Sequence, residues 1–385
     1  MVAMSLLILV ITLLCSQKEF NANMEGCEST IVMVVSVCIL FFVSSSWMFF
    51  FFFFELALIP TLWLILSWGY QPERLQAGVF MMMYTSCASM PLMIILLWMA
   101  GCASSDKFLL VKMLGLELNC WGPLFTFMLV LGFLVKLPVF LVHSWLPKAH
   151  VEAPLPGSML LAGVMLKLGG FGLCRVLWLG GCVDYSLLSV VLVSSVWGGL
   201  ICSGFCLCQS DLKALVAYSS IGHMSLCLCG IFSFFSSGWL GAQSMMFCHG
   251  LCSPMMFCLV AVLYEASQSR SVGLNKGLLV LLPSFVVFWC CFCMLNMGFP
   301  LSLNFISEWV LISSSKGISY LFLPVLGLMC LVTGAYCFYS YGVVCHGGSS
   351  QGFSVSTLTL CRYLYSGVFC IALLMGAFLG LDFFM

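Results

Sequence analysis

Apolar runs and short polar connections alternate along the whole chain. A helix needs about 20 predominantly apolar residues to cross the hydrocarbon core of a membrane, so each run of that kind predicts one membrane-spanning helix. The pattern predicts about twelve helices, and no hydrophilic domain interrupts the series. The helices are expected near residues 3–17, 30–46, 47–68, 77–100, 121–143, 157–177, 187–208, 213–235, 239–263, 278–313, 319–344 and 362–383.

Two of these segments contain residues that interrupt a helix. The fifth carries Lys136 and, two residues later, Pro138, which removes a donor from the helical hydrogen-bond ladder. The tenth is too long for one simple span, contains the run Asn296-Met-Gly-Phe-Pro300 and continues to Glu308. Interrupted helices at corresponding places of two halves are typical of transporters built from inverted repeats. The pattern therefore predicts two such repeats.

The count of helices also predicts the domain organisation. Each repeat holds five helices, and the interrupted helix is the fourth in each. The predicted units are an N-terminal helix and loop at 1–29, a first five-helix repeat at 30–177, an inverted second five-helix repeat at 187–344 and a C-terminal helix at 345–385.

The composition supports an all-α polytopic membrane protein. Of the 385 residues, 63% are hydrophobic and 7% are charged, and the mean hydropathy is +1.18. No soluble domain of this size needs that composition, whereas helices satisfy their own backbone polar groups in lipid. The formal net charge is zero and no basic run occurs, so binding to nucleic acid has no support.

The 24 cysteines are spread through the apolar segments. Pairs such as Cys206/Cys208 and Cys290/Cys291 lack the C-x-x-C spacing of metal sites, so we interpret the cysteines as small core hydrophobes and expect no metal. Cysteine, phenylalanine, glycine, tryptophan and valine are abundant, and all have G/T-rich codons. That bias is typical of organelle genomes.

A few ionisable residues lie inside apolar segments, where a charge at the centre of a membrane costs about 2.5–3.5 kcal/mol. These candidate functional residues are Glu55, Lys136, Lys167, His223, His249 and Glu308. Burial disfavours the charged form and a nearby opposite charge favours it, so such groups can exchange protons near neutral pH. The alternative is a set of static buried ion pairs, with hydrogen-bonded core histidines.

We interpret Lys213, unlike these six candidates, as a structural residue. It follows Asp211, which is a plausible N-cap at the start of a helix. It precedes His223 by ten residues, or about 15 Å along a helix axis, so we expect it near one membrane face.

Longer motifs carry a resemblance to a known family. The longest covers 136–170 and reads KLPVFLVHSWLPKAHVEAPLPGSMLLAGVMLKLGG. Further motifs are ELALIPT at 55–61, QPERL at 71–75, QSDLKALVAYSSIGHM at 209–224, HGL at 249–251 and NFISE at 304–308. In this order they closely resemble chain 4 of mitochondrial NADH–ubiquinone oxidoreductase, over roughly residues 30–345. That family belongs to the antiporter-like subunits in the membrane arm of respiratory complex I.

The resemblance implies roles for the candidate residues. Glu55 is similar to the glutamate that pairs with and modulates the lysine of the broken helix. Lys136 is similar to that lysine, and Lys167 to the central connecting lysine. His223 and His249 are similar to the histidines of the central hydrophilic axis. In the same way, Glu308 is similar to the acid of the second broken helix, near the exit path.

The resemblance also implies a function within a complex. The chain would contribute to proton translocation across the mitochondrial inner membrane, coupled to electron transfer from NADH to ubiquinone. FMN and iron–sulfur clusters would lie in other subunits, and this chain would bind no cofactor. The implied partners are other membrane-arm subunits, especially neighbouring antiporter-like ones, and the lipid bilayer, with cardiolipin as a candidate lipid. The implied coding site is the mitochondrial genome.

One departure from the family and two alternatives stand beside this interpretation. Family members usually have fourteen helices, and only 54 residues precede Glu55 here, so the first two family helices are expected to be absent. The first alternative is a subunit of a multi-subunit cation/proton antiporter, which shares Glu55, Lys136 and Lys167. The second is a structural spacer of the membrane arm that does not pump.

Overall fold

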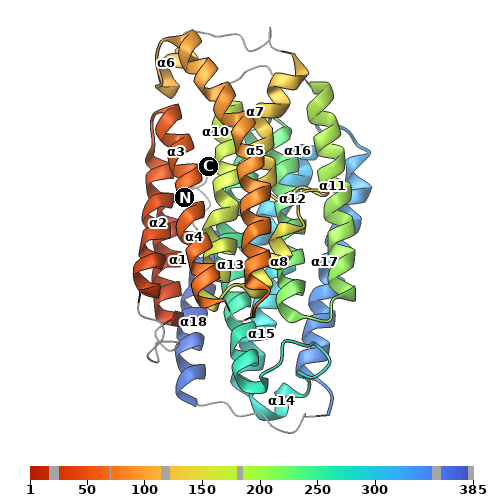
Figure 1. Ribbon diagram of the computed structural model, residues 1–385. Coiled ribbons are helices and arrows are strands. Elements are labelled where there is room, and N and C mark those ends of the chain that lie inside the picture. Colours follow the sequence, from red (N-terminus) through yellow and green to blue (C-terminus); the bar gives the residue numbers. More distant parts are fainter. Residues whose placement is uncertain (17–25, 70, 114–121, 180–184, 349–356, 380–385) are drawn as a thin grey trace.

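The computed structural model describes residues 1–16, 26–69, 71–113, 122–179, 185–348 and 357–379, and within these ranges every regular element is a helix. Most helices run roughly parallel to one another in a single bundle, with the short α6 and α14 at opposite ends (Figure 1). Residues 17–25 of the predicted unit 1–29 lie outside the described residues. The same holds for residues 349–356 and 380–385 of the predicted unit 345–385.

The helices of the first half surround the first predicted interruption. They are α1 (Val2–Ser16), α2 (Cys27–Val43), α3 (Trp47–Leu56), α4 (Leu58–Trp68), α5 (Arg74–Ala103), α6 (Phe108–Met113), α7 (Pro123–Lys136), α8 (Trp145–Glu152), α9 (Leu155–Leu160), a π-helical turn (Leu161–Met165) and α10 (Leu166–Leu179).

The second half holds the other predicted interruption. Its helices are α11 (Tyr185–Cys208), α12 (Leu212–Phe232), α13 (Ser236–Ser267), α14 (Leu278–Leu281), α15 (Pro283–Asn296), α16 (Leu303–Ser315), α17 (Phe322–Cys345) and α18 (Thr357–Leu379).

Seven helical segments of the described residues are long and apolar enough to cross a membrane. They are Trp47–Trp68, Arg74–Ala103, Leu155–Trp178, Ser189–Cys208, Leu212–Phe232, Ser236–Ser267 and Phe322–Cys345. Shorter apolar helices accompany them, among them α1, α2, α7 and α15. The chain is therefore a multi-pass helical membrane protein, while the number of about twelve spans stays a prediction.

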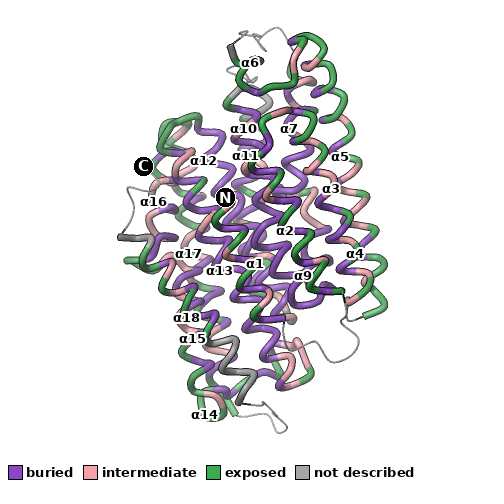
Figure 2. Tube along the Cα trace, turned by 90° about the vertical axis from the view of Figure 1, so that its left-hand side faces the viewer, coloured by how far each residue is buried: buried purple, intermediate pink, exposed green. Residues whose placement is uncertain are grey.

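Burial separates central from peripheral helices. In the most apolar windows of α12 and α13, 94% of the residues are buried inside the bundle, against 28% for α17. Figure 2 shows this difference as continuous purple stretches in the middle of the bundle and green faces at its rim. The central helices carry His223 and His249, so these side chains are far from the lipid-facing surface.

Two local features differ from the sequence expectation. The segment predicted at 47–68 is divided at Ala57, because Pro60 has no N–H to donate to the carbonyl of Leu56. Asp211 does occupy the N-cap position of α12, but its side chain makes no cap hydrogen bond, so the expected capping interaction is absent.

Candidate functional site

The first interruption lies at the end of α7, directly after Lys136. Leu137 takes an extended conformation (φ −84°, ψ 101°), as expected for a residue that precedes a proline. Val139 N–H then reaches back to the carbonyl of Leu134 at 3.3 Å, and Leu141 is left-handed with φ 85°. The helix therefore opens on the C-terminal side of the lysine and resumes at Trp145.

The second interruption repeats this backbone pattern 160 residues later. Phe299 N–H donates to the carbonyl of Met294 at 3.1 Å, and Leu301 is left-handed with φ 76°. With this offset of 160 residues, the counterpart of Lys136 is Asn296. Asn296 is the last residue of α15, as Lys136 is the last residue of α7. The two prolines do not correspond, because Pro300 aligns with Phe140, so different residues produce the same break.

Lys136 is buried and has its partners on α3. Its Nζ donates to the carbonyl of Phe54 at 2.6 Å and lies 3.3 Å from the centre of the Phe54 ring. Glu55, the next residue, is half-buried and interacts electrostatically with Lys136, although the Oε1 atom of Glu55 is without a hydrogen-bond partner among the described residues. The ammonium group of Lys136 therefore contacts the carbonyl and the ring of Phe54, close to the carboxylate of Glu55.

Lys167 follows the π-helical turn and is fully buried. Its Nζ donates to the carbonyl of Ala162 inside that turn and lies 2.8 Å from Nδ1 of His249 on α13. A π-helical turn leaves backbone groups open to partners outside the ladder and is frequent at functional sites. The turn therefore holds the lysine against the histidine.

A polar chain continues from His249 towards the second interruption. The rings of His249 and His223 lie 5.6 Å apart between centroids, and Nδ1 of His223 is 3.6 Å from Oε1 of Glu308. The structure therefore brings Lys167, His249, His223 and Glu308 together, although they come from four different helices.

Glu308 lies close to the second break and depends on two neighbours. Asn304 donates through Nδ2 to Oε1 of Glu308 at 3.2 Å and to the carbonyl of Leu295 at 3.0 Å. Gly298 has φ 74°, and a Cβ atom there would lie 2.6 Å from Oε2 of Glu308. The glycine thus permits both the turn and the approach of the carboxylate.

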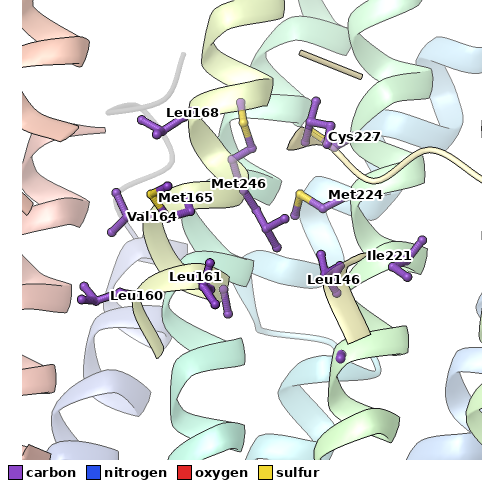
Figure 3. Close-up of a cluster of buried hydrophobic side chains, with 14 of the residues drawn as sticks. Leu146, Leu160, Leu161, Val164, Met165, Leu168, Ile221, Met224, Cys227 and Met246 are labelled. Atoms are coloured by element: carbon purple, nitrogen blue, oxygen red, sulfur yellow. The ribbon is translucent and has the colours of Figure 1, made fainter. Parts of the chain in front are cut away.

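Apolar side chains surround this polar chain. Figure 3 shows a cluster of buried hydrophobic side chains that includes Val164 and Met165 of the π-helical turn, Leu168 of α10 and Met246 of α13. Met224, the residue after His223, belongs to the same cluster. The polar groups therefore share a setting from which bulk water is largely displaced, and this strengthens the electrostatic interactions among them.

Lys136 and Lys167 make no direct contact in the described residues. Their helices nevertheless approach closely, because Gly169 on α10 faces the break: a Cβ there would lie 2.9 Å from the backbone nitrogen of Leu137. The candidate site therefore has two parts, the Phe54–Glu55–Lys136 group and the chain from Lys167 to Glu308.

Two further polar residues, Lys213 and His150, are buried in the bundle, which the sequence did not indicate. Lys213 is 3% exposed and donates to the carbonyl of Ala153, so it is buried beside α8. His150 is 1% exposed and stacks on Phe257 with 4.7 Å between ring centroids. Both stand in the quoted motifs, but a position in a motif does not reveal burial. Among the described residues, no three His, Cys, Asp or Glu side chains form a group suited to a metal ion.

The chain is similar to a known protein family and to several known proteins. Residues 44–333 match the family model described as "NADH:quinone oxidoreductase/Mrp antiporter, TM". The NADH-ubiquinone oxidoreductase chain 4 of Locusta migratoria is 44% identical over 294 residues, which are 76% of this chain and 65% of that protein. The chain 4 of Rhipicephalus sanguineus is 36% identical over 393 residues, which cover 100% of this chain and 87% of that protein.

A solved structure shares the fold. A chain of the respiratory complex I from Thermus thermophilus with bound NADH superposes with a TM-score of 0.88 at 20% identity, covering 98% of this chain and 80% of that chain. The chain spans slightly less than two thirds of the length of the Locusta protein.

Proposed function

The chain belongs to the NADH-ubiquinone oxidoreductase chain 4 family, and from this premise we propose that it is a proton-translocating membrane subunit of respiratory complex I. In this proposal the complex oxidises NADH and reduces ubiquinone in other subunits, which hold FMN and iron–sulfur clusters. This chain moves protons across the mitochondrial inner membrane and has neighbouring antiporter-like subunits and lipid, cardiolipin included, as partners. It is encoded in the mitochondrial genome.

The observation that carries the proposal is the polar chain through the middle of the bundle. Lys167, His249, His223 and Glu308 follow one another from the π-helical turn to the second break. Each of these groups can take up and release a proton, and histidine does so nearest to physiological pH. A static ion pair needs two such groups, whereas a relay needs a series of them.

The proposed coupling starts at the first break. A signal from the redox reaction changes the interaction between Glu55 and Lys136, and the altered charge at Lys136 drives a proton along the chain from Lys167 towards Glu308. Moving one charge against 100 mV costs about 2.3 kcal/mol. Since one pKa unit corresponds to about 1.4 kcal/mol, a change of less than two units at one group supplies that energy.

The proposed repeats fit this mechanism. With units at 30–177 and 187–344, each unit contributes one broken helix. The common hydrogen-bond pattern of the two breaks supports this division.

The test replaces Lys136 by alanine in the assembled complex, reconstituted into vesicles. The number of protons pumped per NADH oxidised should fall, because the charge that responds to Glu55 is gone. Lys167→Ala should lower the same ratio by interrupting the chain. Lys316→Ala serves as the matched control, because Lys316 is exposed at the end of α16. Full pumping by an assembled Lys136→Ala complex would overturn the proposal.

The same preparation separates two other functions. A cation/proton antiporter subunit would purify with other antiporter subunits and without NADH-oxidising activity. A structural spacer would purify with that activity, but its proton ratio would not respond to Lys167→Ala.

A further inference from the structure

His249 shares one face of α13 with a serine that lies one helical turn further along the chain. Residues at positions i and i+4 of a helix are neighbours, and Ser253 stands in that position relative to His249. Ser253 is 4% exposed and His249 is 3% exposed. Both side chains are therefore buried, and the contacts of the serine hydroxyl group are with other groups of the protein.

The hydroxyl group of Ser253 makes two contacts, both with His249. Its Oγ donates to the carbonyl oxygen of His249 at 2.7 Å and lies 3.4 Å from Nδ1 of the same residue. A hydroxyl group has one proton to donate and two lone pairs with which to accept. Because the carbonyl takes up that proton, the hydroxyl oxygen can only accept a hydrogen bond from Nδ1.

Lys167 needs the same nitrogen in the other protonation state. Its Nζ lies 2.8 Å from Nδ1 of His249, and an ammonium group can only donate. While Lys167 is charged, Nδ1 therefore carries a lone pair, and the proton of the neutral imidazole is on Nε2. Once Nδ1 itself is protonated, it becomes a donor, and Oγ of Ser253 is a matching acceptor. Nδ1 thus has one partner for each of its two states.

Close packing of two helical segments holds these three groups together. Pro254 stands inside α13, one residue after the serine, and a Cβ atom on Gly163 of the π-helical turn would lie 3.1 Å from Cγ of Pro254. A Cβ atom on Gly250 would lie 3.4 Å from the carbonyl oxygen of Gly163. The turn that precedes Lys167 therefore packs directly on the part of α13 that carries the histidine and the serine.

We propose that Ser253 is a positioning residue for proton transfer, which holds the proton on Nδ1 of His249 once Lys167 has released it. The inference rests on the proposed function. The ammonium group of Lys167 gives a proton to Nδ1 and becomes a neutral amine. The new Nδ1–H donates to Oγ of Ser253, and the proton on Nε2 leaves towards His223. His249 is then neutral again and cannot take a second proton at Nδ1 until its remaining proton returns to Nε2.

The serine hydroxyl group therefore favours forward transfer over return. Among the described residues, the contacts of Nδ1 of His249 are with Nζ of Lys167 and Oγ of Ser253. Without the hydroxyl group, the protonated nitrogen would be left with the lysine amine as its acceptor, and the proton would return to that amine more often. Fewer protons would then be pumped per NADH oxidised, while NADH oxidation in other subunits would continue.

The first experiment uses the assembled complex in vesicles and measures protons pumped per NADH oxidised. Ser253→Ala removes the hydroxyl group and introduces the residue that helices favour most. We expect its ratio to fall towards that of Lys167→Ala. Ser244→Ala is the matched control, because Ser244 also lies in α13, is 7% exposed and donates to a backbone carbonyl, that of Gly241, at 2.9 Å. The ratio of this control should be that of the unsubstituted complex.

A second pair of variants separates the hydroxyl group from packing. Threonine and valine have nearly the same shape, but only threonine has a hydroxyl group. Ser253→Thr should pump as the unsubstituted complex does, whereas Ser253→Val should lower the ratio as Ser253→Ala does. A native gel shows how much of each complex assembles, and ratios are compared between assembled complexes. If neither variant of this pair assembles, the comparison of Ser253→Ala with Ser244→Ala decides alone.

The outcomes separate the two proposals. If Lys167→Ala lowers the ratio while Ser253→Ala pumps normally, the positioning role is overturned and the proposed function stands. Equal ratios in Ser253→Thr and Ser253→Val, or in Ser253→Ala and Ser244→Ala, would show that the hydroxyl group does not matter, and they overturn the positioning role too. If Lys167→Ala has no effect, the proposed function itself is overturned.

Discussion

At the scale of single residues, the position of Glu308 beside the second break requires a glycine, Gly298, next to its carboxylate. Gly298 has φ 74°, and a Cβ atom there would lie only 2.6 Å from Oε2 of Glu308. A side chain at this position meets two costs, the left-handed backbone and the displaced carboxylate, and the backbone cost alone is about 1–3 kcal/mol.

We therefore predict that Gly298→Ala lowers both the thermal stability of the complex and its proton ratio. The temperature at which NADH oxidation is lost and the protons pumped per NADH measure the two effects. Gly327→Ala is the matched control, because Gly327 lies in α17 and an added Cβ meets nothing within 4 Å. Alanine is favoured over glycine inside a helix by about 0.5–1 kcal/mol, so this variant should be unchanged or slightly more stable. Equal behaviour of the two variants would contradict the prediction.

The sequence singled out the candidate residues but not the groups that they contact. Lys136 and Glu308 stood out because a charge in an apolar run is expensive, and Pro138 marked the break beside the lysine. The contact between Lys167 and His249 joins residues 82 positions apart, and local sequence patterns carry no information on such distances. The partner of Lys136 is a backbone carbonyl, which every residue has, so no residue type could predict it.

At the scale of elements, the broken helix α7–α8 is tied across its gap by one side chain. Nε1 of Trp145, the first residue of α8, donates to the carbonyl of Val135 at 3.0 Å. The break removes the usual helical donor of that carbonyl, because Val139 N–H donates to Leu134 instead. The indole therefore replaces a lost backbone hydrogen bond where water is scarce.

Trp145→Phe should leave the carbonyl of Val135 without its partner, at a cost of about 1–3 kcal/mol. We expect a lower temperature of inactivation and a lower proton ratio, measured on the assembled complex. Trp289→Phe on α15 is the control, because Trp289 is equally buried but its Nε1 has no hydrogen-bond partner among the described residues. Both substitutions remove the same volume, so an equal loss in the two variants would mean that the hydrogen bond is unimportant.

At the scale of the whole molecule, the outer helices present large apolar side chains outwards. On α17, Leu331 is 71% exposed, and Leu321, just before that helix begins, is 81% exposed. The hydropathy pattern alone identified the multi-pass architecture, since a helix in lipid must be apolar on its outer face too. It could not separate central from peripheral helices, because both kinds are apolar all round.

Two lysine substitutions at different depths test this architecture. Leu331→Lys places a cation near the middle of the exposed face of α17, at a cost of about 2.5–3.5 kcal/mol. It should reduce the amount of assembled complex on a native gel. Leu321→Lys should be tolerated, because a lysine at a helix end can extend its ammonium group into water. Normal assembly of the Leu331→Lys variant would show that this face does not meet hydrocarbon or an apolar partner.

The π-helical turn Leu161–Met165 also sets how far α10 is rotated about the helix axis relative to α9. Such a turn is equivalent to one residue inserted into an α-helix, and one residue corresponds to about 100° of rotation. Deleting one residue of the turn would keep every polar group in the sequence and yet rotate Lys167 by that angle relative to α9. The lysine would then face away from His249. Insertions and deletions in this turn would therefore change the contact between Lys167 and His249 through geometry alone, without any change in the chemical groups.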